Sequence, residues 1–286
     1  MHGQSPSSFV HPAARLRQLG LHASKRLSQS FLADPAIARA IVAAAGLDRA
    51  RDQVLEVGPG LGILTERLVR RARRVVAVEL DAQLAAWLPG SINAPNLEVH
   101  QADILHFDPS RVFDEPYVVV ANLPYHVTSP ALRHLLAAGP PYAARFVLMV
   151  QREVADRVVA PPGQLSALAV SIQAQATARI VRRVPASAFY PPPKVDSGVL
   201  LLEPLPETQR VVSRDAQAAF TEFVHAGFAQ PRKQLANSLA QGLACDKATI
   251  QSLLGAQGID PRRRPQELTV AEWERLFRVL SPARIG

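Results

Sequence analysis

The stretch that most constrains this chain runs from Val54 to Leu68 and reads VLEVGPGLGILTERL. Its apolar beginning is typical of a strand buried on both faces, and the spacing of Leu64 and Leu68 predicts a helix. Glycines at positions 58, 60 and 62 separate the two elements. Such a turn brings backbone N–H groups and a helix N-terminus beside a ligand. The stretch therefore predicts a ligand site in an α/β protein; a tight turn without a ligand is the alternative.

Glu79 ends the next apolar run, residues 75–79, and indicates the type of ligand. A carboxylate at the end of a second strand can accept hydrogen bonds from both hydroxyls of a ribose. The glycines follow the pattern G-x-G-x-G, whereas dinucleotide enzymes have G-x-G-x-x-G, and no Gly-Lys-Ser/Thr follows. We therefore expect a nucleoside without a pyrophosphate, and S-adenosylmethionine fits this description.

Composition limits the class of protein. The chain has 286 residues, of which 48% are hydrophobic and 20% are charged, as in globular proteins. A formal net charge of +8 favours a polyanionic partner, although an arginine-rich composition can also reflect genomic bias. The single cysteine, Cys245, excludes disulfides within the chain and cysteine-cluster metal sites. The histidines show no metal-ligand spacing, so no metal is expected.

The sequence contains neither a membrane span nor a secretory signal. No apolar run approaches the roughly 18 residues that cross a membrane, and the N-terminus lacks the apolar segment of a signal peptide. A cytoplasmic location is therefore expected.

Strands and helices alternate along the first two thirds of the chain. Apolar runs predict strands at 54–57, 75–79, 97–100, 117–121, 146–150, 178–184 and 198–202. This order predicts a Rossmann-like α/β domain with a mostly parallel sheet and a late antiparallel hairpin. Gly58, Glu79, Asp103 and Asn122 lie at successive strand ends, where such sheets bind ligands. Pro89 and Gly90 predict the end of one helix.

Three regions are expected. Residues 1–14 are predicted to form a mobile extension, residues 15–205 the α/β domain, and residues 206–286 a small all-α domain. The last of these shows only helical spacing, and Thr269 with Glu272 forms the sequence pattern of a capping box.

The segment Asn122-Leu123-Pro124-Tyr125 carries the chemistry. The exocyclic amine of adenine is a poor nucleophile because its lone pair is delocalised into the ring. The Asn122 side-chain oxygen and a backbone carbonyl, that of Leu123, can accept hydrogen bonds from this amine and free the lone pair, so orientation and electrostatics supply most of the rate and no strong general base is needed. Tyr125 offers a ring on which the base can stack, worth ~1–3 kcal/mol. An Asn-Pro turn with a half-buried tyrosine is the alternative.

These motifs together resemble the ribosomal RNA adenine dimethyltransferase family, and within it the bacterial small-subunit branch. The resemblance runs from about Leu19 to about Leu280. It rests on the glycine stretch, Glu79, Asp103, the Asn122 tetrapeptide, QREVADR at 151–157, FYPPPKVDS at 189–197, RKQLANSL at 232–239 and RPQEL at 264–268. It implies seven strands in the sheet and a class I methyltransferase fold.

The resemblance also implies particular residue roles. Catalytic positions would be Asn122, Leu123, Pro124, Tyr125 and Phe189, with the two aromatic rings clamping the target base. Cofactor contacts would come from Gln29, Ser30, Leu32, Gly58, Gly60, Glu79, Leu80, Asp103, Ile104 and Asn122. The reaction would convert two neighbouring adenosines in the 3′-terminal hairpin loop of 16S rRNA, within an immature small subunit, to N6,N6-dimethyladenosine. An unstacked loop base costs least to extrude.

Two segments depart from the family. Ser28-Gln29-Ser30 stands where members usually carry Gly-Gln-Asn or Gly-Gln-His, so a weaker or water-bridged contact from Ser30 is expected. A Ser-Lys-x-Tyr-Gly segment that usually follows the proline-glycine break is missing after Gly163. Neither departure affects the Asn122 tetrapeptide.

Basic residues are assigned by their position. RNA contacts are expected from Lys25, Arg26, Lys194, Arg232 and Lys233. Another arginine cluster, at positions 67, 70, 71, 73 and 74, is interpreted as interacting favourably with a helix dipole and increasing solubility.

A monomer is expected. The alternatives are an erythromycin-resistance-type 23S rRNA methyltransferase, a small-molecule or protein methyltransferase, and a non-catalytic ribosome-assembly or transcription factor on the same fold.

Overall fold

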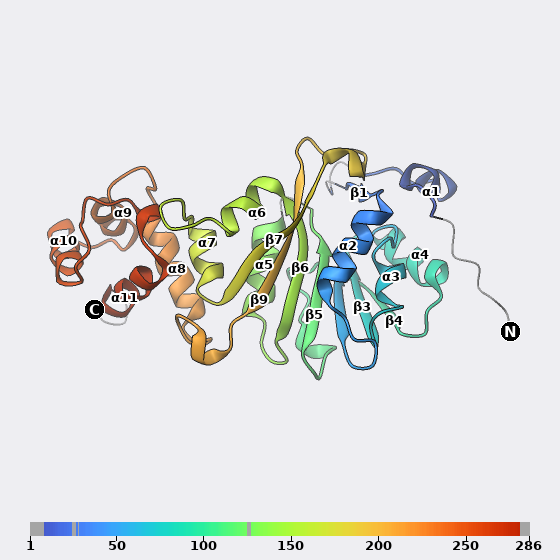
Figure 1. The fold of residues 1–286 in the computed structure, drawn as a ribbon, viewed down its shortest axis with the longest axis horizontal. Helices are drawn as coiled ribbons and strands as arrows, with labels where there is room; N and C mark the ends of the chain where they lie inside the picture. Colours follow the sequence, from blue (N-terminus) through green and yellow to red (C-terminus); the bar gives the residue numbers. More distant parts are fainter. Residues whose placement is uncertain (1–8, 25–26, 28, 125–126, 281–286) are drawn as a thin grey trace. The chain divides into compact units, whose positions relative to one another are not determined.

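The computed structural model describes residues 9–24, 27, 29–124 and 127–280, which form two compact units (Figure 1). Unit 1 comprises the chain up to Arg152 together with Ile180–Leu201, and unit 2 comprises Glu153–Arg179 and the chain from Leu202 onward. Residues 153–179, which we had included in the α/β domain, therefore group with the C-terminal helices. Among the described residues, no helix is both long and apolar enough to span a membrane.

A seven-stranded sheet is formed by the described residues. Its members in chain order are β2 Gln53–Val57, β3 Arg74–Glu79, β4 Leu97–Gln101, β5 Tyr117–Asn122, β6 Ala143–Gln151, β7 Ala176–Val184 and β9 Ser197–Pro204. The spatial order is β4-β3-β2-β5-β6-β9-β7, and the first five strands pair in parallel. This arrangement confirms the predicted mostly parallel sheet with a late antiparallel hairpin. Strands β2, β3 and β5 are almost wholly buried, as their apolar runs predicted.

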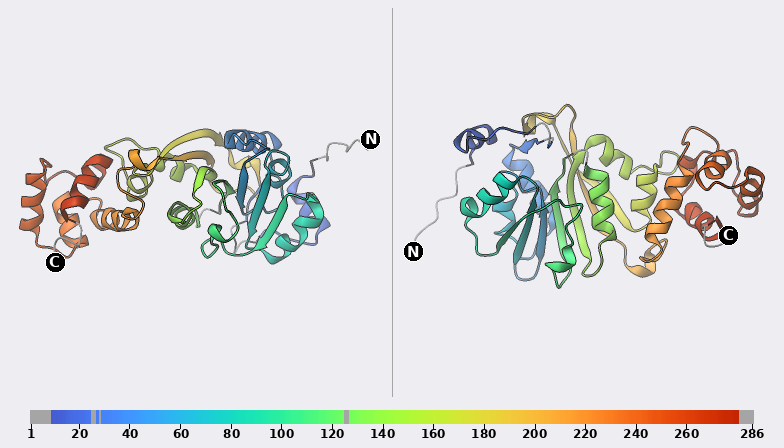
Figure 2. Two further views of the ribbon diagram at one scale, coloured as in Figure 1. Left: turned by 90° about the horizontal axis from the view of Figure 1, so that it is seen from below. Right: turned by 180° about the vertical axis from the view of Figure 1, so that it is seen from behind.

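Helices cover both faces of the sheet in unit 1. They are α1 Pro12–Gln18, α2 Pro35–Ala45, α3 Thr65–Leu68, α4 Ala82–Ile92 and α5 Thr128–Ala137. Helix α2 lies in front of the strands in Figure 1, and α5 lies in front when the molecule is seen from behind in Figure 2. The side chain of Asp34 caps the start of α2, and Gly46 ends it in the left-handed conformation.

The prediction that Pro89 and Gly90 end a helix is wrong. Helix α4 continues through Pro89 to Ile92 and ends at Asn93, whose φ is 42°. Leu88 is fully buried, and Ile92 packs against the main core. Packing of this apolar face outweighs the hydrogen bond that proline cannot donate.

A second, two-stranded sheet joins distant parts of unit 1. Strand β1, Phe31–Leu32, pairs antiparallel with β8, Phe189–Tyr190. Beside it, the N–H of Ala33 donates to the carbonyl of Ala188 at 2.7 Å. The pairing holds the segment before α2 against the predicted Phe189 loop.

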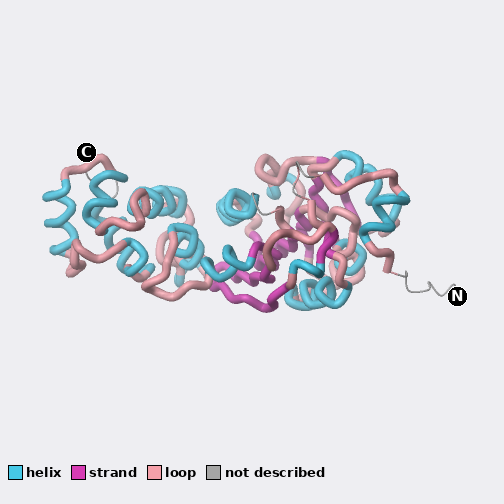
Figure 3. Tube along the Cα trace, turned by 90° about the horizontal axis from the view of Figure 1, so that it is seen from above, coloured by secondary structure: helices cyan, strands magenta, loops and turns pink. Residues whose placement is uncertain are grey.

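The described part of unit 2 from residue 205 onward contains helices and loops only (Figure 3). The helices of unit 2 are α6 Arg152–Val158, which begins at the unit boundary, α7 Ala167–Gln173, α8 Gln217–Gly227, α9 Leu235–Gly242, α10 Lys247–Ala256 and α11 Val270–Leu280. Fully buried Trp273 lies in their common core, 5.3 Å from the ring of Phe228. Thr269 and Glu272 exchange side chain–backbone hydrogen bonds of 3.2 and 2.7 Å, which confirms the capping box.

We expect Gly242→Ala to destabilise unit 2 by about 1–3 kcal/mol, because of steric overlap. A Cβ at this position would lie 2.0 Å from the carbonyl oxygen of Ala226, and a backbone atom of a packed helix cannot move aside. Gly255→Ala is the matched control, since nothing lies within 4 Å of its Cβ position and alanine favours the helix. Urea denaturation followed by circular dichroism measures both; equal stability of the two variants would contradict the overlap.

Candidate active site

A pocket lies at the carboxyl ends of β2, β3 and β5. Its volume is ≈ 580 Å³ including the open space at its mouth. It is lined by Gln29, Ser30, Phe31, Gly58, Gly60, Glu79, Leu84, Asn122, Leu123, Pro124 and Phe189. Sequence positions far apart thus meet where the alternation of strands and helices predicted a ligand site.

The glycine turn forms the floor of the pocket and requires glycine. Gly58, Gly60 and Gly62 have φ values of +67°, +55° and +80°, a region that residues with a side chain rarely adopt. A Cβ on Gly60 would also lie 3.1 Å from the ring of Phe31. The Gly58 N–H donates to the carbonyl of Val78 at 2.9 Å, which holds the turn against the end of β3. Bare backbone therefore faces the pocket.

Glu79 ties the turn to the next strand. One carboxylate oxygen accepts the N–H of Gly60 at 3.0 Å, and the other accepts the N–H of Asp81 at 2.9 Å. The side chain is buried, and this burial raises the pKa of the Glu79 carboxyl. Each oxygen keeps a second lone pair. The carboxylate can therefore fix the turn and still accept hydrogen bonds from a ribose.

Asn122 is oriented by the segment that precedes α2. Its Nδ2 donates to the backbone carbonyl of Ser30 at 3.3 Å. This bond fixes the orientation of the amide, whose Oδ1 remains available to accept a hydrogen bond from a ligand. Ser30 thus acts through its backbone, so the short side chain at this position does not weaken this contact.

Gln29 connects the same segment to the end of β3. Its Nε2 donates to the carboxylate of Asp81 at 3.1 Å, and its Oε1 accepts the N–H of Ser24 at 2.8 Å. Asp81 also caps α4. The predicted residues Gln29, Glu79 and Asn122 are therefore parts of one hydrogen-bonded frame around the pocket.

Four predicted cofactor residues do not line this pocket. Leu32 and Ile104 are buried, and Leu80 is 49% exposed. The Asp103 carboxylate accepts the N–H of Leu105 at 2.9 Å. Conversely, Phe31 and Leu84 line the pocket but were not predicted, because the sequence pattern around each is that of an ordinary core residue. Phe189 lines the pocket but is only 5% exposed, and it packs with Leu32 in the main core.

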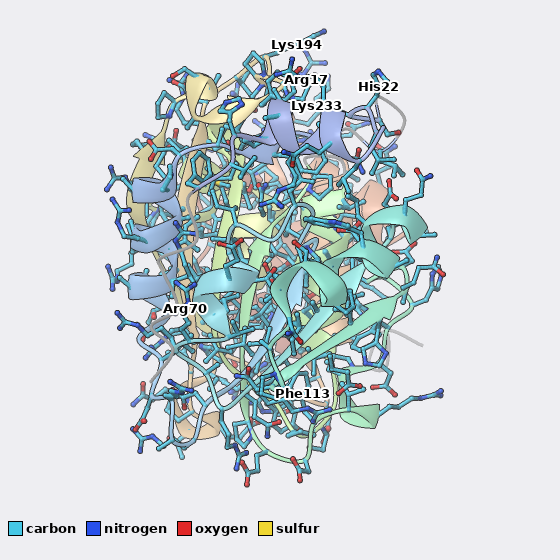
Figure 4. All side chains as sticks on the ribbon, turned by 90° about the vertical axis from the view of Figure 1, so that its right-hand side faces the viewer. Arg17, His22, Arg70, Phe113, Lys194 and Lys233 are labelled. Atoms are coloured by element: carbon cyan, nitrogen blue, oxygen red, sulfur yellow. The ribbon has the colours of Figure 1, made fainter. Side chains whose placement is uncertain are left out.

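The remaining predicted site residues either do not line the pocket or are not among the residues that the structure describes. Tyr125, Lys25 and Arg26 lie outside the described residues. Lys194 is exposed in the loop between β8 and β9, at the same end of unit 1 as Arg17 (Figure 4). Arg232 and Lys233 are exposed before α9 in unit 2.

A second carboxylate, Glu56, lies beneath the turn and was not predicted. It is 1% exposed in β2, and its carboxyl lies against Thr65 at the start of α3, whose contacts only partly offset the cost of burial. Burial, with a smaller contribution from the charge of Glu79, raises the pKa of Glu56 to about 8. Glu56 is therefore protonated at neutral pH.

The sequence profile of the family described as "Ribosomal RNA adenine dimethylase" matches residues 20–281. The chain belongs to this family. Its relatives include the "Ribosomal RNA small subunit methyltransferase A" of Dehalococcoides mccartyi strain CBDB1, 41% identical over 95% of this chain and 93% of that protein. The protein of the same name from Geobacillus thermodenitrificans is 39% identical over 93% of this chain and 94% of that protein.

Solved structures agree with this dimethylase family. A dimethyladenosine transferase from Plasmodium falciparum is 25% identical and superposes with a TM-score of 0.72, covering 87% of this chain and 97% of that one. The 23S rRNA methyltransferase ErmE is 29% identical with a TM-score of 0.66, covering 87% and 99%. The protein is therefore an rRNA adenine dimethyltransferase with a methyltransferase fold, and the family and fold imply S-adenosylmethionine as the methyl donor.

The residues of the pocket fit such a donor. The bare backbone at Gly58 and Gly60 leaves room for a nucleoside ligand to pass close to the turn. Glu79 retains lone pairs that can accept hydrogen bonds from its ribose. The apolar side chains of Phe31 and Leu84 complete the wall.

Glu56→Gln is expected to remove a pH dependence of stability. Between pH 4.5 and about 8 the folded state holds a proton that the unfolded chain has lost, so the free energy of unfolding falls as pH rises, by up to about 1.4 kcal/mol per pH unit. The variant lacks this contribution, so its stability relative to the parent should increase from pH 5 to pH 8. Denaturant titrations at several pH values measure the difference. Parallel curves would show that Glu56 is not protonated.

Proposed function

We propose that the protein transfers methyl groups from S-adenosylmethionine to N6 of two adjacent adenosines in the 3′-terminal hairpin loop of 16S rRNA. The product is N6,N6-dimethyladenosine, formed on an immature small subunit in the cytoplasm by a monomeric enzyme. The observation that carries this proposal is the orientation of Asn122, whose amide nitrogen is held by the Ser30 carbonyl. Its oxygen is thereby directed to accept a hydrogen bond from an amine.

Different residues of the pocket bind the methyl donor and orient the target base. Glu79 holds the ribose of the donor, and the glycine turn lies beneath it. When bound, the donor supplies an electrophilic methyl group on sulfur. The Asn122 oxygen and the Leu123 carbonyl accept hydrogen bonds from the adenine amine, which directs its lone pair toward that methyl group. Pro124 stiffens the loop, and Phe189 and Tyr125 position the base.

Cofactor contacts from Leu32, Leu80, Asp103 and Ile104 remain part of the proposal. Leu80 is an exposed apolar side chain next to Glu79, so a bound adenine ring would cover it. Lys25, Arg26 and Lys194 are proposed to hold the RNA beside the pocket. Arg232 and Lys233 give the helical C-terminal region, residues 206–286, an RNA-binding role.

Two observations favour the small subunit as substrate. Relatives named for small-subunit rRNA are 39–41% identical over nearly the whole chain, whereas ErmE, named for 23S rRNA, is 29% identical. The intact geometry around Asn122 favours an enzyme over a non-catalytic assembly factor.

Labelled S-adenosylmethionine with unmethylated 30S or 50S particles tests the substrate. We expect two adjacent dimethylated adenosines near the 3′ end of 16S rRNA, mapped by primer extension and mass spectrometry. Label in 23S rRNA would support the erythromycin-resistance-type alternative. Donor binding without any transfer would support the non-catalytic one.

Asn122→Ala is expected to lower the rate of methyl transfer by at least about 100-fold while donor affinity stays within about threefold, because the lost acceptor acts on the target amine. Asn122→Asp is the companion variant, since it keeps an acceptor oxygen but loses the donor to Ser30. Its residual rate should exceed that of the alanine variant. Calorimetry measures donor binding, and single-turnover assays measure transfer. Equal loss of binding and transfer would show that Asn122 is a scaffold residue.

A further inference from the structure

A second charged surface lies on unit 1, away from the pocket. It consists of the arginines at 39, 49, 67, 70 and 71, which we call the arginine face. Arg39 belongs to α2 and Arg67 to α3, so two elements separated in sequence bring these charges together. In Figure 4, Arg70 is on the flank of the unit, apart from the end at which Lys194 and Arg17 lie.

Two adjoining grooves run through the arginine face. One, of ≈ 1040 Å³ including its mouth, is lined by Arg39, Arg67, Arg70 and Arg71 together with Phe9. The other, of ≈ 1470 Å³, is lined by Arg49 and Arg70 and by the loop that precedes β4. Arg70 and Glu66 line both grooves, so the surface is continuous.

The charge of this face is only partly compensated. Glu66 is the one acidic residue among the described residues that line the grooves. Within the described part of the chain, no hydrogen bond or ion pair engages the side chains of Arg39, Arg49, Arg70 and Arg71. Arg67 donates to the carbonyl of Ile63 at 2.6 Å, and burial lowers the pKa of Arg67, with the charge of Glu66 opposing this shift and those of Arg39 and Arg70 adding to it. Several like charges are thus held close together with a single counter-charge.

The arginines at 67, 70, 71, 73 and 74, which form one cluster in the sequence, differ in the structure by whether they have acidic partners. Arg73 is paired with Glu115, and Arg74 is paired with Glu98 at 2.5 Å, so these two have partners within the fold. Helix α3 ends at Leu68, so Arg70 and Arg71 lie beyond it. The favourable interaction of an arginine with a helix dipole falls off within the last turn of that helix. The dipole of α3 therefore does not explain why Arg39, which belongs to α2, lies beside these arginines.

The second groove of the arginine face lies at the edge of the sheet opposite to the pocket. The pocket lies at the carboxyl end of β3, whereas this groove is lined by residues that precede β3 and β4. Strand β3 has six residues, so these edges are about 20 Å apart. A phosphate in this groove would therefore lie several nucleotides or more from a base in the pocket.

We propose that the arginine face binds the phosphate backbone of a second segment of small-subunit rRNA, one that does not contain the methylated adenosines. The proposal rests on the rRNA substrate proposed above. Unpaired guanidinium groups along these grooves match the charge of a folded RNA backbone and carry no base specificity. Phe9 is 44% exposed in the same groove and offers a ring for an unpaired base.

The test is the triple variant R39Q/R70Q/R71Q, which spares Arg67 because of its bond to Ile63. The matched control is R51Q/R111Q/R157Q, which removes the same charge from exposed arginines already paired with Asp48, Asp108 and Glu153. Binding to unmethylated 30S particles is measured from 50 to 300 mM salt. The triple variant should bind about tenfold more weakly at 100 mM, with a salt slope smaller by about two to three. The control should stay within about twofold.

Two further measurements separate the outcomes. With saturating particles the triple variant should keep its kcat for methyl transfer and show a raised KM. Hydroxyl-radical footprinting should lose protections outside the methylated hairpin. Binding equal to the control, an unchanged salt slope, or lost protections confined to that hairpin would each overturn the arginine face as a second RNA contact. Absence of transfer by the parent protein would instead overturn the proposed function, since binding and footprinting are measured without it.

Discussion

The pocket depends on a buried carboxylate that serves two backbone segments at once. Glu79 accepts the N–H groups of Gly60 and Asp81, so a single side chain joins the glycine turn after β2 to the start of α4. A charge-assisted hydrogen bond in a buried place is stronger than a neutral one, and it is costly to leave unmade. The turn therefore has a fixed shape before any ligand arrives, and ligand binding need not supply the energy for ordering it.

The other hydrogen bonds around the pocket are anchored to this fixed end of β3. Asp81, whose N–H is held by Glu79, receives the amide of Gln29, and the neighbouring Ser30 carbonyl receives the amide of Asn122. The glycine turn and the Asn122 loop are thus connected through a short chain of hydrogen bonds. This connection gives Asn122 a fixed orientation relative to the turn, and reactions between two bound molecules depend on such fixed geometry.

Much of this arrangement could be predicted from the sequence. The mostly parallel sheet with its late hairpin follows from the alternation of apolar runs, and Glu79 and Asn122 could be placed because carboxyl ends of parallel strands share one edge. Other features depend on packing that no local pattern shows. Pro89 lies inside a helix because Ile92 is needed against the core, and Ser30 contributes its carbonyl, which every residue has. The buried state of Glu56 could not be read from a strand in which a carboxylate normally faces water. The arginines at 67–74 look equivalent in sequence, yet only Arg73 and Arg74 find acidic partners after folding.

The pairing of β1 with β8 has a consequence for how the protein is made. Phe31 contacts the pocket floor and is held by Tyr190, so the wall of the pocket closes only across a very long loop of chain. Closing such a loop is slow, and it cannot begin until the distal strand has been synthesised. A nascent chain that has completed only the first five parallel strands carries the glycine turn but leaves this wall unpaired. The wall of the pocket is therefore completed late in translation, after most of the first unit has left the ribosome.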